Sequence, residues 1–205
     1  MNVTAEIAAA AAVLVVEEGM EYAAAKRKAA RAFGVSGSRP HLPSDEEVED
    51  AVREHIALFC SETQAAELQA LREVAALWMQ RLADFRPHVG GAVWRGTATA
   101  LSTVRLDLYC DDAKSAQIRL INEGVDFDSG ELPGHGREPL SVLTLTSRSV
   151  KLRDAVTVHL VLHDADDQRG ALLRDARGQS WRGDLPALQR LMTTVSEGAQ
   201  PQAEL

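Results

Sequence analysis

Residues 90 to 108 decide how the chain folds, and they read GGAVWRGTATALSTVRLDL. Helical periodicity stops just before them, at Phe85-Arg86-Pro87. After Gly90 and Gly91, residues 92–94 form a short strand candidate. From Val104 to Leu108, apolar and polar residues alternate. Because successive side chains of a strand point to opposite faces, this alternation predicts a half-buried strand.

The sequence before this stretch predicts helices. A first helix should begin near Thr4 and stop near Gly19, and a second should run from about residue 22 to 33. Ser44 with Glu47, and Ser61 with Gln64, have the spacing of capping boxes and predict the starts of two more helices. The N-terminal part should therefore contain about four helices.

The sequence after this stretch predicts a mixed α/β arrangement. Asp111 or Asp112 should cap a helix over residues 113–123, and Asp184 should cap the last helix. Residues 140–150 and 156–162 are rich in Val and Thr and predict strands. We therefore expect an α+β fold, with a helical N-terminal module, residues 1–60, packed on a small mixed sheet within residues 61–197. Residues 198–205 should be a disordered tail.

Composition and charge exclude some partners. The 205 residues carry a formal net charge of −8, which disfavours binding to duplex nucleic acid. The apolar run from Ile7 to Val16 is shorter than the roughly 20 residues of a membrane span, and we interpret it as a buried or self-associating helix that could form a homo-oligomer. Cys60 and Cys110 belong to no metal-binding motif, which favours a reduced, cytoplasmic setting.

The stretch from Gly90 to Leu108 resembles the signature of the DNA polymerase β-like nucleotidyltransferase superfamily. That signature has a Gly-Ser or Gly-Thr pair after a helix and a strand, and then Ser-Asp-hydrophobic-Asp on the next strand. Gly96-Thr97 matches the first element, and Ser102 matches the serine of the second. The resemblance covers roughly residues 61–165 and implies a sheet of nucleotidyltransferase type.

The resemblance also implies a chemistry. In the family, two carboxylates on one strand face and a third from a neighbouring strand hold two Mg²⁺ ions against a nucleoside triphosphate. The glycine loop places backbone amides against a phosphate. By this resemblance Gly96, Thr97 and Ser102 are candidates for binding the phosphates of a nucleotide.

The carboxylate positions of the signature fall on Thr103 and Arg105 in this sequence. Asp107 is on the same strand face as Arg105, one pleat further on, and is the candidate catalytic residue if activity remains. We interpret the chain as a nucleotidyltransferase-like fold whose metal site has decayed. The alternative is a shifted Mg²⁺ site that uses Asp107 with Asp111 or Asp112. Residues 164–167 are a further acidic segment.

Arg95 and Arg105 flank the candidate phosphate loop. An arginine guanidinium can neutralise phosphates without a metal, because its donors form a planar fork. The same two residues could equally make ion pairs on the surface of an acidic protein. Three hypotheses therefore remain: an inactive nucleotide-binding protein, an interaction or oligomerisation module without enzymatic activity, and an active Mg²⁺-dependent transferase.

Overall fold

The computed structural model describes residues 2–35, 42–132, 139–170, 178 and 180–198. The fold is α+β, as expected, and its contacts divide the chain into two compact units. The first unit contains residues 1–68 and 96–102, and the second contains residues 69–95 and 103–205. The expected domain boundary after residue 60 remains a prediction. Residues 199–205 of the predicted tail lie outside the described part.

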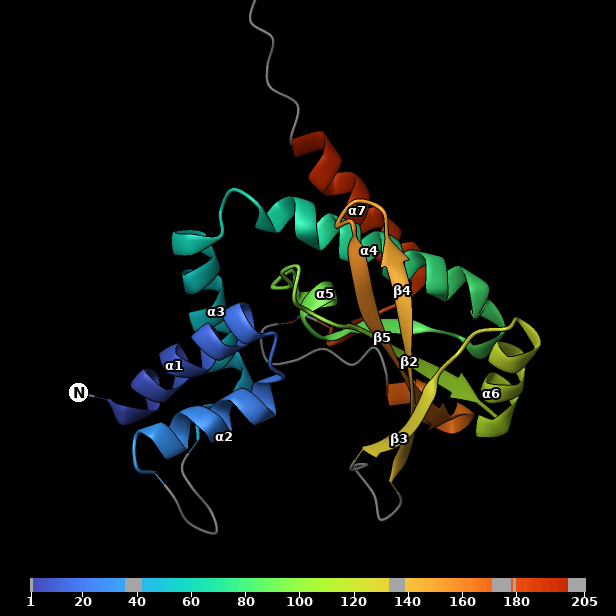
Figure 1. The fold of residues 1–205 in the computed structure, drawn as a ribbon, viewed down its shortest axis with the longest axis horizontal. Coiled ribbons are helices and arrows are strands. Elements are labelled where there is room, and N and C mark those ends of the chain that lie inside the picture. Colours follow the sequence, from blue (N-terminus) through green and yellow to red (C-terminus); the bar gives the residue numbers. More distant parts are fainter. Residues whose placement is uncertain (1, 36–41, 133–138, 171–177, 179, 199–205) are drawn as a thin grey trace, which may run out of the picture. The chain divides into compact units, whose positions relative to one another are not determined.

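Three helices form the core of the first unit, and they are α1 (Val3–Glu18), α2 (Tyr22–Ala32) and α3 (Asp45–Phe59). Helix α1 packs against both others (Figure 1). Its buried side includes Ile7, Ala11 and Val15, so the apolar run is used inside the chain. Gly19 ends α1 at φ 66°, and a Cβ there would lie 2.6 Å from the Leu101 carbonyl oxygen.

The two predicted capping boxes have different outcomes. Ser44 caps α3 as expected, because its side chain accepts from the Glu47 amide and the Glu47 carboxylate accepts from the Ser44 amide. The helix predicted after Ser61 is present, but the capping box of Ser61 with Gln64 was wrong. Gln64 is the first residue of α4 (Gln64–Arg81), and its side chain donates to the carbonyls of Gly96 and Ala98. Helix α4 begins in the first unit and continues in the second.

A six-stranded mixed sheet in the order β3-β4-β5-β2-β1-β6 organises the second unit. The strands are β1 (His88–Gly90), β2 (Val104–Cys110), β3 (Asp128–Leu132), β4 (Leu140–Ser149), β5 (Asp154–Asp164) and β6 (Arg182–Gly183). Strands β2 and β5 are parallel, and the other pairs are antiparallel. The order of strands and helices predicted from the sequence lacked β3 and β6.

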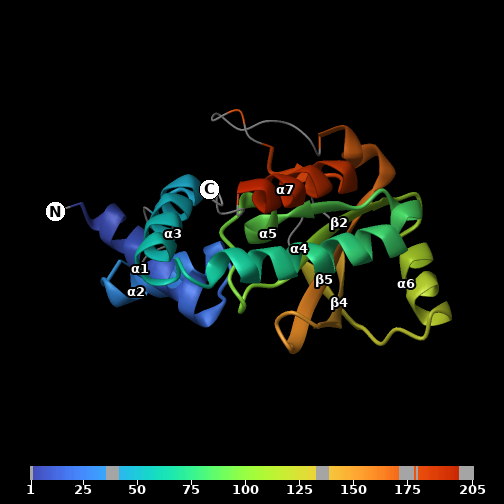
Figure 2. The ribbon, with the colours of Figure 1, turned by 90° about the horizontal axis from the view of Figure 1, so that it is seen from above.

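Helices α4 and α7 (Leu185–Gly198) lie on either side of β2 (Figure 2). Helix α6 (Ala113–Asn122) contacts β2 and β5, and of the two predicted caps, Asp111 or Asp112, the Asp112 side chain caps it. Asp184 caps α7 by accepting from the Ala187 amide. Short 3-10 helices, η1 (Ala83–Phe85) and η2 (Ala165–Gly170), complete the unit. No helix of the described residues is both long enough and apolar enough to cross a membrane.

Residues 92–94 do not form the predicted strand. They belong to a short helix, α5 (Gly91–Arg95), and the strand β1 lies just before them. Gly91 adopts φ 62°, a left-handed conformation that ends β1 and turns the chain. The Trp94 indole then donates to the Ser180 carbonyl, and its ring packs where a Cβ on Gly183 would lie. These tertiary contacts outweigh the local strand tendency of residues 92–94.

Candidate functional site

One face of the central sheet is polar, although it lies in the middle of the second unit. Residues that pair across adjacent strands have their side chains on the same face. The pairing of β2 with β1 and β5, and of β1 with β6, gathers one set of polar side chains in this way. The set comprises Arg105, Asp107, Tyr109, His88, His159, His163 and Arg182. On the opposite face, Leu106, Leu108, Leu160 and Leu162 are buried.

Asp107 is the centre of this polar face and is fully buried. Its Oδ1 lies 2.7 Å from His163 Nε2 and 3.1 Å from an Arg105 guanidinium nitrogen. Its Oδ2 lies 2.9 Å from Arg182 Nε but accepts no hydrogen bond from a described residue. Arg182 therefore compensates the charge of Oδ2 without the alignment of a hydrogen bond. Two guanidinium groups and one imidazole surround a single carboxylate.

These neighbours control the ionisation of Asp107. Burial alone would raise the pKa of the carboxyl, because a charged group is poorly solvated inside the protein. The hydrogen bond from His163 and the charges of Arg105 and Arg182 outweigh burial, so the pKa lies below its usual value. Asp107 is therefore an anion at neutral pH, held inside a cationic surround.

A second layer of aromatic groups positions this cluster. The Tyr109 hydroxyl accepts from Arg182 at 3.1 Å, and its ring stacks on His163 at a centroid distance of 5.2 Å. Burial raises the pKa of Tyr109, and Arg182 opposes this only in part. His88 meets the Tyr109 ring edge-on, and its Nδ1 donates to the Arg86 carbonyl. The layer fixes the direction of both Arg182 and His163.

The other predicted carboxylates lie elsewhere. Asp112 caps α6, and the highly exposed Asp111 side chain lies 3.8 Å from Arg86. Among the described residues, no group of three or more His, Cys, Asp or Glu side chains is arranged to hold a metal ion. Asp107, Asp111 and Asp112 thus do not form such a group. Arg105 and Asp107, by contrast, are brought into direct contact.

The candidate phosphate loop, residues 96–102, belongs to the first unit, whereas Arg95, Arg105 and Asp107 belong to the second. Thr97 is buried, and its hydroxyl lies 3.4 Å from the Tyr22 hydroxyl. The Ser102 hydroxyl accepts from the Thr99 amide. The carbonyl of Gly96 accepts from Gln64. The hydroxyl groups of Thr97 and Ser102 therefore already make contacts within the first unit.

Arg95 is buried, and its guanidinium lies 4.5 Å from the centre of the Trp181 ring. This is the geometry of a cation–π interaction. Trp181 and Arg182 follow each other in the chain, so Arg95 packs beside the segment that brings Arg182 to Asp107. Of the predicted phosphate ligands in the second unit, Arg105 is the more accessible, with 39% of its side chain exposed.

Reasoning from the sequence missed His163, Tyr109 and Arg182 as members of the site. The shared strand face of His159 and His163 was a usable signal, since the alternation of β5 predicts it. That Tyr109 lies beside His163 could not be predicted, because this contact depends on the parallel pairing of β2 with β5, two strands that are far apart in the sequence. Arg182 lies in a strand of two residues, which is too short to leave a pattern.

No protein-family model matches the chain, and no curated protein sequence matches it. Solved structures match parts of it. A cytoplasmic RNA terminal U-transferase superimposes with a TM-score of 0.36 and 19% identity, over 54% of this chain and 36% of that chain. The resemblance is to nucleotidyltransferases.

The Cid1 poly(U) polymerase with MgGTP bound gives a TM-score of 0.34 and 15% identity, over 50% of this chain and 33% of that chain. Cid1 in complex with the UTP analogue UMPNPP gives a TM-score of 0.33 and 17% identity, over 54% of this chain and 37% of that chain. The chain thus spans about a third of the length of these nucleotidyltransferase structures. The similarity is distant.

Proposed function

We propose that this chain is a nucleotidyltransferase-like protein that has lost metal-dependent catalysis and binds the phosphates of a nucleotide without a metal ion. One observation carries the proposal: the buried carboxylate of Asp107 is surrounded by Arg105, Arg182 and His163. The signature resemblance around Gly96-Thr97 and Ser102 supplies the class of ligand.

The charge arrangement supports the loss of catalysis. Mg²⁺ requires oxygen ligands in a near-octahedral shell and is repelled by nearby cations. Both oxygens of Asp107 lie within 3.1 Å of a cationic or imidazole nitrogen. Arg105 also occupies one of the two carboxylate positions of the signature. These residues do not fit a Mg²⁺ site, so the proposal contains no step through a metal.

The same arrangement supports binding of an anion. Two guanidinium groups face one carboxylate, so the cluster keeps a surplus of positive charge. A phosphate can accept parallel hydrogen bonds from a guanidinium, and such charge-assisted bonds are stronger than neutral ones. Arg105 is accessible enough to bind a phosphate, and Arg182 would add a second positive charge beside that phosphate. Arg95 and the loop of Gly96, Thr97 and Ser102 remain candidate ligands through the resemblance.

The test is a thermal-shift titration with ATP, CTP, GTP and UTP, each with and without Mg²⁺. Ligand binding raises the free energy of unfolding by RT ln(1 + [L]/Kd), and the melting temperature rises with it, so weak ligands are visible at millimolar concentration. The proposal predicts a shift that does not need Mg²⁺ and that Arg105→Ala reduces. Arg169→Ala is the control, because Arg169 is exposed and lies outside the cluster.

Two results would overturn the proposal. A shift that requires Mg²⁺ and disappears in Asp107→Asn would favour an active transferase with a rearranged carboxylate set around Asp107, Asp111 or Asp112. No shift with any nucleotide would favour a protein-interaction module.

The interaction module has one observation of its own. Leu58 and Phe59, at the end of α3, expose 67% and 72% of their surfaces. Exposed large apolar side chains of this kind mark candidate contact surfaces, including a homo-oligomer of the N-terminal helices. This alternative predicts that Phe59→Ser lowers the molecular mass in solution, as measured by light scattering. A monomeric mass for both proteins would contradict it.

A further inference from the structure

Among the described residues, nothing pairs with one edge of strand β4 along its second half, and this edge is called the free edge. Strand β3 pairs with β4 only from Leu140 to Thr144, where Thr144 faces Asp128. Strand β4 continues to Ser149, and β5 pairs with it along its other side to that end. No strand of the described residues pairs with residues 145–149 on the β3 side. The backbone groups on that side are therefore a template for another strand.

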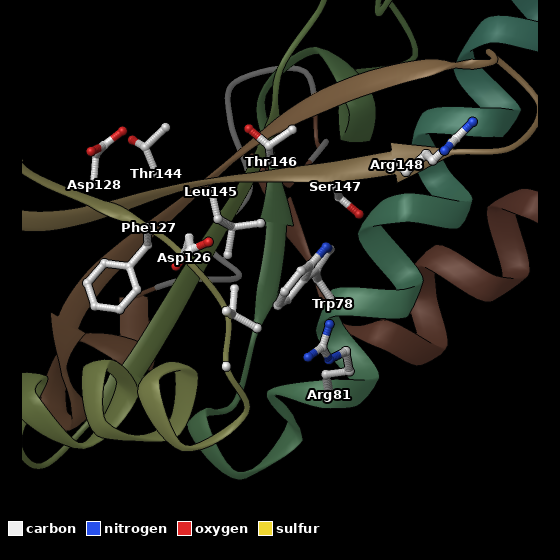
Figure 3. A pocket seen from close by; sticks show the side chains of 12 residues that line it. Trp78, Arg81, Asp126, Phe127, Asp128, Thr144, Leu145, Thr146, Ser147 and Arg148 are labelled. Carbon is white, nitrogen blue, oxygen red and sulfur yellow. The ribbon is translucent and has the colours of Figure 1, made fainter.

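A groove follows this free edge. Figure 3 shows that the chain from Asp128 back through Phe127 and Asp126 diverges from β4, with Trp78 and Arg81 of α4 across the opening. The groove has a volume of about 570 Å³, and residues 144–148 of β4 line one of its sides.

The groove contains polar groups without partners. The Trp78 indole nitrogen is buried and makes no hydrogen bond with a described residue. Figure 3 shows this nitrogen on the side of the ring nearest Ser147. Arg148 is exposed and makes no ion pair or hydrogen bond with any other residue that the structure describes. Arg81, by contrast, is paired with Glu123 and lies over the Trp78 ring.

We propose that residues 145–149 of β4 are a docking edge for an extended peptide of another protein, which adds to the sheet as an antiparallel strand. Backbone hydrogen bonds supply affinity in such strand addition, and alternate side chains supply specificity. The site is separate from the Asp107 cluster, so this inference does not depend on the proposed function.

The pattern of β4 defines the chemistry of this peptide. Leu145 and Ser147 are buried on the side of Trp78, whereas Thr146 and Arg148 are exposed on the opposite face. Side chains opposite Leu145 and Ser147 should therefore be apolar, and the one opposite Arg148 should be acidic. Beyond the residue opposite Leu145 the peptide must leave the edge, because Asp128 already pairs with Thr144. Its next side chain lies near Asp126 and Asp128, which favours a basic residue there. From its N-terminus, the expected peptide therefore has an acidic, an apolar, a β-branched, an apolar and a basic residue.

The probe is the synthetic peptide acetyl-Glu-Val-Thr-Val-Lys-amide, titrated into the ¹⁵N-labelled full chain and followed by NMR. We expect saturable shifts at about 1 mM peptide, concentrated on the backbone amides of residues 145–149 and the Trp78 indole. Arg148→Glu should weaken binding about two- to five-fold, and the peptide acetyl-Lys-Val-Thr-Val-Lys-amide, in which only the residue opposite position 148 is reversed in charge, should recover it. The matched control is Arg169→Glu, which leaves the groove unchanged.

N-methylation of the peptide tests the strand geometry. In an antiparallel pair, only alternate residues of the peptide donate their N–H groups to β4. One of two peptides, methylated at the first valine or at the threonine, should therefore lose binding while the other retains it. Equal loss by both, shifts elsewhere on the protein, or no shifts at all would overturn the proposal. Alternate amides of residues 145–149 point toward β5 and are protected by that pairing. Protection of the other amides, which point away from β5, without peptide would also overturn the proposal, because a second copy or another segment of this chain would then occupy the edge.

Discussion

The side chain of Asp107 is the most constrained single group in the second unit. Removing one partner of a buried ion pair leaves the other charges uncompensated, which typically costs about 3–5 kcal/mol. We therefore expect Asp107→Asn to lower the free energy of unfolding by about 3 kcal/mol in urea at neutral pH. Asp166→Asn is the control, because Asp166 is exposed. Equal stability of the two variants would show that the cluster does not depend on the carboxylate charge.

Asp107 also makes the free energy of unfolding depend on pH in the acidic range. The folded-state pKa of Asp107 is lowered below its value of about 3.9 in an unfolded chain. The stabilisation it provides is therefore complete above the unfolded-state pKa and is lost as the pH falls through the folded-state pKa. The difference in stability between the wild type and Asp107→Asn should shrink below about pH 4. A difference that is constant from pH 7 to pH 3 would contradict this assignment.

At the scale of elements, two side chains join the start of α4 to the segment of residues 96–102. Gln64 donates to two backbone carbonyls, those of Gly96 and Ala98, and the Glu67 carboxylate accepts from the Ala100 amide. Gln64→Ala should destabilise the first unit by about 1 kcal/mol, since the carbonyls lose their donor. Faster hydrogen exchange of residues 97–102 would check this prediction, with the exposed Gln80→Ala as control. Unchanged exchange would show that other contacts hold the segment.

At the scale of the whole molecule, charge decides which partners can approach. A formal net charge of −8 repels the phosphates of duplex DNA. We expect no binding of a 20-base-pair duplex to about 10 µM protein in 150 mM salt, measured by fluorescence anisotropy. Salt-sensitive binding in this range would contradict the prediction and would point to a local basic surface. The cluster around Arg105 is consistent with this expectation, because its surplus charge is local.

Much of the local structure could be predicted from the sequence. The alternation from Val104 to Leu108 predicted β2 and placed Arg105 and Asp107 on one face. The spacing of Ser44 and Glu47 predicted the start of α3, and the aspartates before α6 and α7 predicted their caps. These features depend on residues within a turn or a pleat of one another, so the sequence determined them by itself.

Only the tertiary structure decided what Asp107 does. Its partners His163 and Arg182 are far away in sequence, and strand pairing brings them to it. The same holds for β4, where the pairing with β3 ends at Thr144. It holds also for α5, where contacts of Trp94 outweigh a local strand tendency. Local propensity leaves such choices open because competing local structures differ by about 1 kcal/mol. Burial and pairing between distant segments contribute more than this and determine the outcome.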